Sequence, residues 1–372
     1  MDRSKVMPGS TLVEHLEQRC LYSVMHPGGP SPFLSHLTGA PTQSVSTVPA
    51  SGDQNPYGVA FVPNGFARGG PLQPGDVLVS NFNNAANNQG TGTTIIRETP
   101  AGQTSVFFQG PAGLGLTTAL GVLKRGFVIV GSAPTLNGDG AHEQPPGSLL
   151  ILDRHGNIVT TLADQKLLDG PWDLTVQDQG SRALVFVANV LNGTVSRINL
   201  ALSAKGDAVK VLSMTQIASG YAFRTDPSAL VVGPTGLAYD HRRQLLYVAS
   251  TADNAVFAIK HAATTGTQSG TGDVIYKDDV HLRGPLGLAF APNGDLLTAN
   301  GDAVTPATSN GTNSGIVEFS PKGLFVDEIT IHPNPDAAFG IALSNSGSLV
   351  RFAAVNDNTN MLEVWNVSRR QL

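Results

Sequence analysis

The sequence feature that most constrains the fold is a short apolar motif that recurs along the chain. Its copies are NPYGVAF, TTALGVL, GPWDLTV, GPTGLAY, GPLGLAF and AAFGIAL. Each copy has a central residue, here called the anchor, and the six anchors are Gly58, Gly121, Asp173, Gly236, Gly287 and Gly340. Successive anchors lie 51 to 63 residues apart. Repeats of roughly this length, with four short strands each, are typical of β-propeller blades, so six copies predict six blades.

The fifth copy shows the expected blade. Its four strands are LGLAFA, DLLTAN, GIVEFS and LFVDEIT, here called A to D in chain order. The pairs Asn293-Gly294 and Lys322-Gly323 separate A from B and C from D, and such pairs supply the positive φ that tight hairpins need. The composition agrees, because 42 glycines and only 14% charged residues suit a β protein rich in turns.

The last copy lacks a fourth strand, and a spare strand precedes the first copy. The chain ends after LVRFAAVN and MLEVWNV, whereas QSVSTVP (residues 43–49) has no partner of its own. We expect this N-terminal strand to join the last blade and close the ring, which removes a free sheet edge. The predicted fold class is therefore all-β, a six-bladed propeller of four-stranded blades over residues 43–372. Residues 1–42 are predicted to be a targeting-like segment and linker.

Charge, hydropathy and cysteine content exclude several classes of protein. The net charge is −5 and no Lys/Arg cluster occurs, so a nucleic-acid partner is not expected. No apolar run reaches the roughly 18 residues of a membrane helix, so no transmembrane segment is predicted. Cys20 is the single cysteine, which rules out an internal disulfide.

The repeat resembles a known family of propellers. The pattern GLAF, NGDLLTAN and GIVEFSPKG is similar to NHL-type repeats and their relatives, the senescence-marker-protein/gluconolactonase group and the virginiamycin-lyase-like group. The resemblance covers residues 43–367 and implies a fold more than a function, because propellers host enzymes, binding modules and scaffolds alike.

The N-terminal segment LVEHLEQRCLYSV is similar to the LEPRxLLS-type motif of surface or exported proteins of planctomycete-like bacteria. Leu16, Glu17, Arg19, Leu21 and Ser23 match this motif. The match implies an extracellular or cell-surface location. The alternative is a short amphipathic helix that carries no address.

Long polar loops gather on one face of the predicted ring. B–C loops at residues 81–92, 132–147 and 301–313, and the D–A connection 218–234, share this face, whereas most A–B and C–D turns on the other face are short. Insertions on one face usually mark a binding face, so the channel mouth there is the predicted binding site. The alternative is drift in exposed loops, which tolerate insertions.

Two sets of side chains frame that mouth. Strand B ends in Asn81, Asn189, Asn300 and Asn356, whose amides can bind a polar ligand or a hard cation, or can instead cap their own turns. Tyr57, Trp172 and Phe339 precede anchors and would form an aromatic collar for a sugar or another small ligand, or would simply pack between blades.

Asp173 stands where the other anchors are glycine, and a buried carboxylate needs a partner or a metal. The gluconolactonase resemblance implies a divalent metal held by a Glu, two Asn and an Asp. Asp173, Asn189 and Asn81 would supply part of that set, with Asp173 also the candidate catalytic residue, although Tyr57 stands where the Glu is expected. The lyase resemblance implies a histidine, for which His281 and His332 are the candidates. NGDGAHE (residues 137–143) resembles half of a calcium loop, or a plain Asn-Gly turn.

Two functions remain open from the sequence. The first is an exported propeller that binds a small molecule, glycan or protein partner through its loop-rich face without chemistry. The alternative is a divalent-metal-dependent propeller enzyme of lactonase or lyase type, with Ca²⁺ or another divalent ion as its cofactor.

Overall fold

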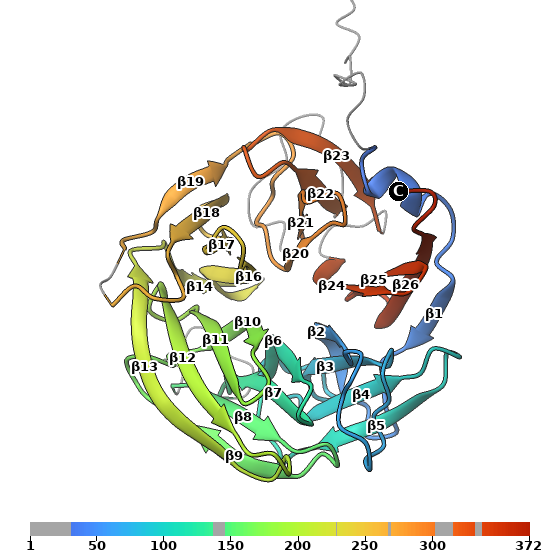
Figure 1. Ribbon diagram of the computed structural model, residues 1–372, viewed down its shortest axis with the longest axis vertical. Helices are drawn as coiled ribbons and strands as arrows, with labels where there is room; N and C mark the ends of the chain where they lie inside the picture. Colours follow the sequence, from blue (N-terminus) through green and yellow to red (C-terminus); the bar gives the residue numbers. More distant parts are fainter. Residues whose placement is uncertain (1–30, 137–145, 228, 267–268, 302–314, 332–336) are drawn as a thin grey trace, which may run out of the picture. The chain divides into compact units, whose positions relative to one another are not determined.

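A computed structural model describes residues 31–372 apart from 137–145, 228, 267–268, 302–314 and 332–336. Residues 31–372 form one compact unit. Six four-stranded antiparallel sheets are arranged around a common axis (Figure 1), so the predicted six-bladed propeller is confirmed. No helix in the described part of the chain is long and apolar enough to cross a bilayer.

The blades follow one another in chain order, each from its inner strand outward. Blade 1 contains β2 (Gln54–Phe61), β3 (Val77–Asn83), β4 (Thr94–Glu98) and β5 (Thr104–Gln109). Blade 2 contains β6 (Leu116–Leu123), β7 (Phe127–Ser132), β8 (Ser148–Leu152) and β9 (Ile158–Leu162). Blade 3 contains β10 (Pro171–Asp178), β11 (Arg182–Asn189), β12 (Thr194–Leu202) and β13 (Val209–Ser219).

A small hairpin, β14 (Arg224–Asp226) and β15 (Leu230–Val232), connects blade 3 to blade 4. Blade 4 contains β16 (Pro234–Asp240), β17 (Leu245–Ser250), β18 (Ala255–Lys260) and β19 (Asp273–Tyr276). Blade 5 contains β20 (Leu288–Phe290), β21 (Leu296–Ala299), β22 (Gly315–Phe319) and β23 (Phe325–Thr330). Blade 6 contains β24 (Ala338–Ser346), β25 (Leu349–Asn356) and β26 (Met361–Ser368).

The fourth strand of blade 6 comes from the other end of the described chain. β1 (Gln43–Ser46) pairs antiparallel with β26, with Gln43 opposite Val364 and Ser46 opposite Met361, so the sheet order is β1-β26-β25-β24. Strands that begin and end the ring therefore share one sheet, and β26 is not left as an open edge.

Residues 31–42, expected as linker, pack on the propeller instead. The 3₁₀ helix η1 (Leu34–Leu37) buries Leu34 and Leu37, and Phe33 meets Phe352 edge-on with ring centroids 6.1 Å apart. The buried carboxylate of Glu318 in blade 5 accepts hydrogen bonds of 2.9 Å from the backbone N–H groups of Phe33 and Leu34. These contacts were missed because Pro and Ser in this segment suggested a linker.

The seam between blades 6 and 1 contains a buried charge cluster. The guanidinium of Arg351 in β25 donates to the Gly75 carbonyl, lies 3.9 Å from the carboxylate of Glu98, and donates to the side chain of Gln43 in β1 at 3.3 Å. One side chain thus contacts both blades and the N-terminal strand. Glu98 is 1% exposed, and both of its carboxylate oxygens lack a hydrogen-bond partner.

Burial raises the pKa of Glu98 to about 7; the nearby Arg351 opposes this shift and Asp76 adds to it. Because the folded protein holds this proton more tightly than the unfolded chain does, the free energy of unfolding should fall as pH rises from about 4.5 to about 7.

Deletion of residues 43–49 should lower the melting temperature sharply. The deletion removes β1 and reopens the edge of β26, and a loss of several kcal/mol corresponds to roughly 10 °C for a domain of this size. Differential scanning calorimetry of the truncated and full chains measures the change. Equal melting temperatures would show that the ring does not depend on this strand.

The substitution Glu98→Gln should remove one component of the pH dependence of stability. Relative to the variant, the wild type should lose up to about 3 kcal/mol of unfolding free energy between pH 4.5 and pH 8, because the neutral amide has no proton to release. Urea unfolding of both proteins across this range provides the comparison. Parallel curves at every pH would contradict a desolvated Glu98 carboxyl.

Candidate functional site: the central channel

The innermost strands approach one another so closely around the axis that a side chain would not fit at most anchors. A Cβ added to Gly236 would lie 2.0 Å from the Leu286 carbonyl oxygen of the next blade, and one on Gly340 would lie 2.0 Å from that of Tyr57. The N–H of Gly236 donates to the same Leu286 carbonyl at 3.1 Å. Glycine is therefore required at these anchors because the backbone of the next blade lies too close for a Cβ. The sequence predicted this for Gly58, Gly236, Gly287 and Gly340.

The anchor of blade 2 was misplaced by the sequence pattern. In blade 1, Val59 pairs with Val79, two residues before Asn81; in blade 2, Leu120 pairs with Val130, two residues before the equivalent Ser132. Ala119, rather than Gly121, therefore occupies the anchor position. The bulge at the start of β6 holds one residue more than the bulge in β2, which shifts the motif along the strand.

Asp173 is the true anchor of blade 3 and the one carboxylate among the anchors. Its side chain accepts a hydrogen bond of 2.7 Å from the backbone N–H of Leu174 and another from the N–H of Leu237 in blade 4. No cationic side chain pairs with it among the described ion pairs. Burial raises the pKa of Asp173 well above its ordinary value, and the two backbone donors offset this only in part. The folded protein therefore holds the proton of this carboxyl more tightly than water holds that of an exposed acid.

Asp173 borders a small cavity on the ring axis. The cavity has a volume of about 130 Å³ and every blade contributes to its wall: Val59, Thr118, Leu120, Asp173, Leu174, Thr175, Leu237, Gly287, Leu288, Gly340 and Ile341. Asp173 is the ionisable member of this otherwise neutral lining. At the roughly 30 Å³ that a water occupies in the liquid, the space suits about four waters or one small ring.

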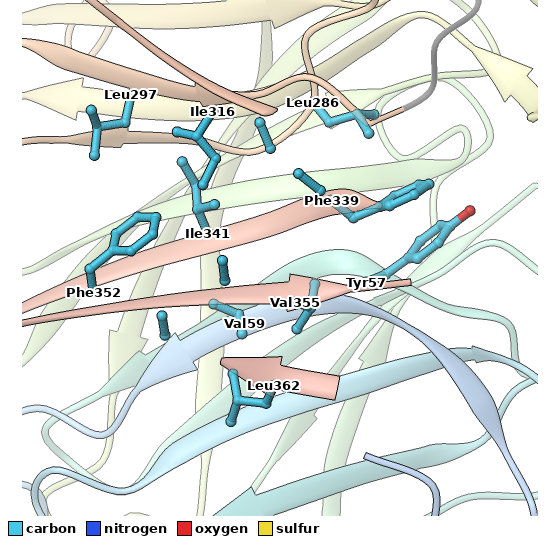
Figure 2. Packing of buried hydrophobic residues seen from close by; sticks show 14 of the residues in the cluster. Tyr57, Val59, Leu286, Leu297, Ile316, Phe339, Ile341, Phe352, Val355 and Leu362 are labelled. Atoms are coloured by element: carbon cyan, nitrogen blue, oxygen red, sulfur yellow. The ribbon is translucent and has the colours of Figure 1, made fainter. Parts of the chain in front are cut away.

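The predicted aromatic collar packs upon itself. The ring of Tyr57 stacks on Phe339 at 4.6 Å and on Phe82 at 4.5 Å between centroids, and Trp172 meets both Tyr57 and Phe82 edge-on. All four side chains are at most 4% exposed. Figure 2 shows the rings of Tyr57 and Phe339 side by side at the end of the inner strands. The structure thus gives Tyr57, Trp172 and Phe339 the packing role that the sequence left open. Phe82 was missed because it follows the predicted strand end at Asn81.

The predicted asparagines hold the connections that lead into the blades. The Nδ2 groups of Asn81, Asn189 and Asn300 donate to the backbone carbonyls of Thr47, Leu167 and His281, at 2.8, 3.2 and 2.6 Å. Asn356 accepts from the N–H of Thr359 at 3.3 Å within its own turn. None of these four residues borders the cavity. These asparagines therefore bond to backbone, as the capping alternative predicted. Three of them reach the connection that precedes their blade rather than their own turn.

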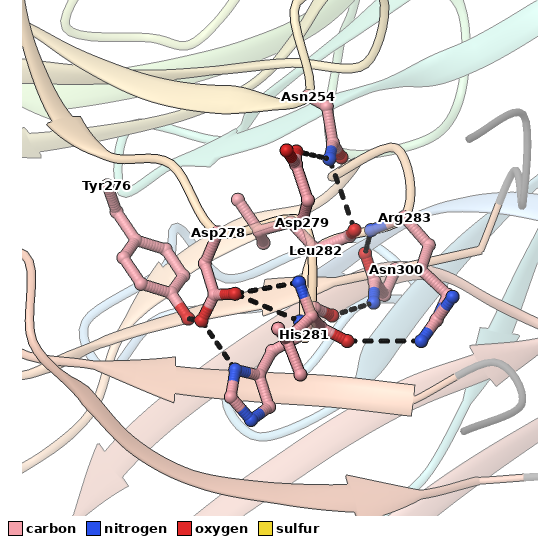
Figure 3. Close-up of polar contacts among 9 residues, drawn as sticks. Asn254, Tyr276, Asp278, Asp279, His281, Leu282, Arg283 and Asn300 are labelled. Atoms are coloured by element: carbon pink, nitrogen blue, oxygen red, sulfur yellow. Dashed lines mark hydrogen bonds and ion pairs between the residues drawn. The ribbon is translucent and has the colours of Figure 1, made fainter. Parts of the chain in front are cut away.

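The connection between blades 4 and 5 contains His281 in a polar cluster (Figure 3). Its Nδ1 lies 2.5 Å from Asp278 Oδ2, and the hydroxyl of Tyr276 donates to the same oxygen at 3.0 Å. The imidazole stacks on Phe325 of the outer strand β23 with centroids 3.7 Å apart. Burial opposes ionisation of Asp278, but hydrogen bonds led by that from His281 outweigh it and lower the pKa. Because β23 is the outer strand of blade 5, this pair lies away from the cavity.

Three sequence predictions fall on residues that the structure does not describe. They are the LEPRxLLS-like segment at residues 12–24, the calcium-loop-like stretch at 137–143, and His332. The long B–C loop at 301–313 also lies almost wholly outside the described residues.

The donors expected for a divalent metal do not come together. No group of three or more His, Cys, Asp or Glu side chains that could hold an ion occurs among the described residues. The side-chain oxygens of Asn81 and Asn189 are buried without a donor, yet neither residue borders the cavity that contains Asp173. The residues present therefore do not fit the metal that the resemblance implies.

Comparison with known proteins shows the fold. No protein-family model and no curated protein matches the sequence. The calcium-binding protein regucalcin from Agrobacterium tumefaciens superposes with a TM-score of 0.52 at 12% identity, covering 89% of this chain and 96% of its own. A structure provisionally named a gluconolactonase superposes with a TM-score of 0.51 at 14% identity, covering 92% and 98%. The chain therefore shares its propeller fold with these two proteins.

The substitution Gly340→Ala should destabilise the ring, because the new methyl group would overlap the Tyr57 carbonyl oxygen of the neighbouring blade. We expect a loss of roughly 2–4 kcal/mol, as for other overpacked cores. Gly266→Ala is the matched control, since nothing lies within 4 Å of its Cβ position. Chemical unfolding of both variants measures the difference. Equal stabilities would show that the inner strands can move apart without cost.

Proposed function

We propose that the protein is a propeller enzyme that hydrolyses a small uncharged ester or lactone in its central channel, with Asp173 as the group that transfers protons. The proposal is carried by one observation: a carboxyl group without a cationic partner borders a cavity that is otherwise neutral. Perturbed acids in a concave site are characteristic of catalytic groups. The likeness to a provisionally named gluconolactonase adds the reaction class as an analogy.

The geometry favours this function over partner binding at the loop-rich mouth. The aromatic residues that would bind a ligand there contact one another, and the asparagines hold backbone. The cavity volume of about 130 Å³ limits the reacting part of the ligand to a small ring or terminal group.

The chemistry needs one acid–base group and water. Ionised Asp173 would remove a proton from a water molecule as the water oxygen bonds to the ester carbonyl carbon. The bond from that carbon to the ring oxygen then breaks, and protonated Asp173 returns the proton to the leaving oxygen. Lactone and water together give the hydroxy acid. A raised pKa makes the carboxylate a stronger base, at the expense of the ionised fraction at a given pH.

Asp173→Asn should lower the rate of hydrolysis of small lactones, such as γ-butyrolactone and δ-valerolactone, by at least about 100-fold. The amide still accepts backbone hydrogen bonds, so the fold should survive. Asp169→Asn is the matched control, because burial also raises the pKa of Asp169 and yet it lies outside the cavity lining. Titration of released acid at constant pH measures the rate, which in the wild type should rise with pH as Asp173 ionises.

Two results would contradict the proposal. One is a wild-type protein that hydrolyses no lactone or simple ester above the background rate. The other is Asp173→Asn with wild-type activity. We also expect the rate and the melting temperature to be the same with and without EDTA, because the described donors do not form a metal site.

A further inference from the structure

The two ends of the central channel differ in their packing. At the end where the inner strands begin, which carries the long B–C loops, Tyr57, Phe82, Trp172 and Phe339 fill the space and are at most 4% exposed. Their rings contact across blades 1, 3 and 6, so a small molecule has no open path between them. This aromatic cluster thus fills the loop-rich end of the channel at blades 1, 3 and 6.

At the opposite end the inner strands become more accessible. In β10, Pro171, Trp172 and Leu174 are buried, whereas Asp173 and Thr175 to Asp178 are partly exposed. β16 ends in two partly exposed residues after five buried ones, and the same change occurs along β20. In β24, Ile341 is 8% exposed and the residues that follow it are more accessible. Accessibility therefore rises toward the short A–B turns in at least four of the six blades.

Asp173 shares one side of its strand with the residues on this route. Side chains alternate along a strand, so Asp173, Thr175 and Gln177 point to one side of blade 3. That side faces blade 4, because Asp173 accepts a hydrogen bond from the N–H of Leu237. Leu174 and Val176 point toward blade 2, because a Cβ added to Gly121 of that blade would meet their side chains. Thr175 borders the cavity, and Gln177 is the next residue on that side toward the turn.

We propose that small molecules reach Asp173 from the short-turn face, opposite the loop-rich face, along a path lined by Thr175 and Gln177 of blade 3. The inference rests on the proposed function for its catalytic meaning, since the path leads to the group assigned there. It makes the short A–B turns the entrance of the channel. It differs from the expectation that the binding site lies at the loop-rich mouth.

Cysteine labelling tests the path without requiring any activity. Cys20 is the single cysteine, so Cys20→Ser gives a cysteine-free background. In that background, Thr175→Cys and Gln177→Cys place thiols on the path. Thr235→Cys is the matched control at the loop-rich end, where Thr235 is 2% exposed and donates to the Pro285 carbonyl at 3.1 Å. A small water-soluble methanethiosulfonate reagent is added to each folded variant, and modification is followed by mass spectrometry.

The expected order of rates is Gln177→Cys, then Thr175→Cys, with Thr235→Cys slower than Thr175→Cys by at least about tenfold, because thiol reactivity follows exposure. Adding Gln177→Trp to the Thr175→Cys variant should slow its labelling several-fold by narrowing the entrance. Melting temperatures near that of the background protein confirm that each variant is folded.

Two outcomes would overturn the inference. One is Thr175→Cys as unreactive as Thr235→Cys in folded protein. The other is Thr235→Cys reacting as fast as Thr175→Cys, which would place an opening at the loop-rich end. Labelling at Thr175 in a protein that hydrolyses no lactone would leave the path standing and reject the proposed function; lactone hydrolysis with no labelling at Thr175 would do the reverse.

Discussion

The close approach of the innermost strands around the ring axis is the constraint on which the rest of this structure depends. A propeller buries its blades against one another, and the inner strands are where the spacing is smallest. At Gly236 and Gly340 the neighbouring carbonyl oxygen lies where a Cβ would be, so these positions accept no side chain without movement. The backbone N–H groups freed by this spacing bond across blades, as Gly236 does to Leu286. The same spacing leaves a cavity that holds only a few water molecules.

The raised pKa of Asp173 follows from its place at an anchor, where most blades have glycine. A side chain at an anchor has to lie between two blades, and here the carboxyl is held by the N–H groups of Leu174 and Leu237. Removal from water without a cation raises its pKa, because the charged form loses more solvation than two amide donors restore. The proton of this carboxyl is therefore held more tightly than the proton of an acid on the surface.

The ends of the ring are joined by contacts that differ from those within blades. β1 pairs with β26, Arg351 contacts blade 1 and β1, and Glu318 holds the backbone of Phe33 and Leu34. The hydrogen bonds among these contacts join residues 276 to 308 positions apart in sequence. Because they depend on buried charges, the stability of the seam should respond to pH.

The sequence by itself determined the number of blades, the four-strand pattern and most anchors, because the repeated motif and the hairpin turns are local properties of the chain. It misplaced the anchor of blade 2, since the one extra residue in the bulge of β6 cannot be recognised from the motif. It proposed both a ligand-binding and a packing role for the aromatic residues and the asparagines. Only the tertiary structure could decide between these, because the partners of Tyr57 and Asn81 come from distant segments of the chain. Which end of the channel is filled depends on side chains from three blades meeting on one axis, and no single repeat contains that information.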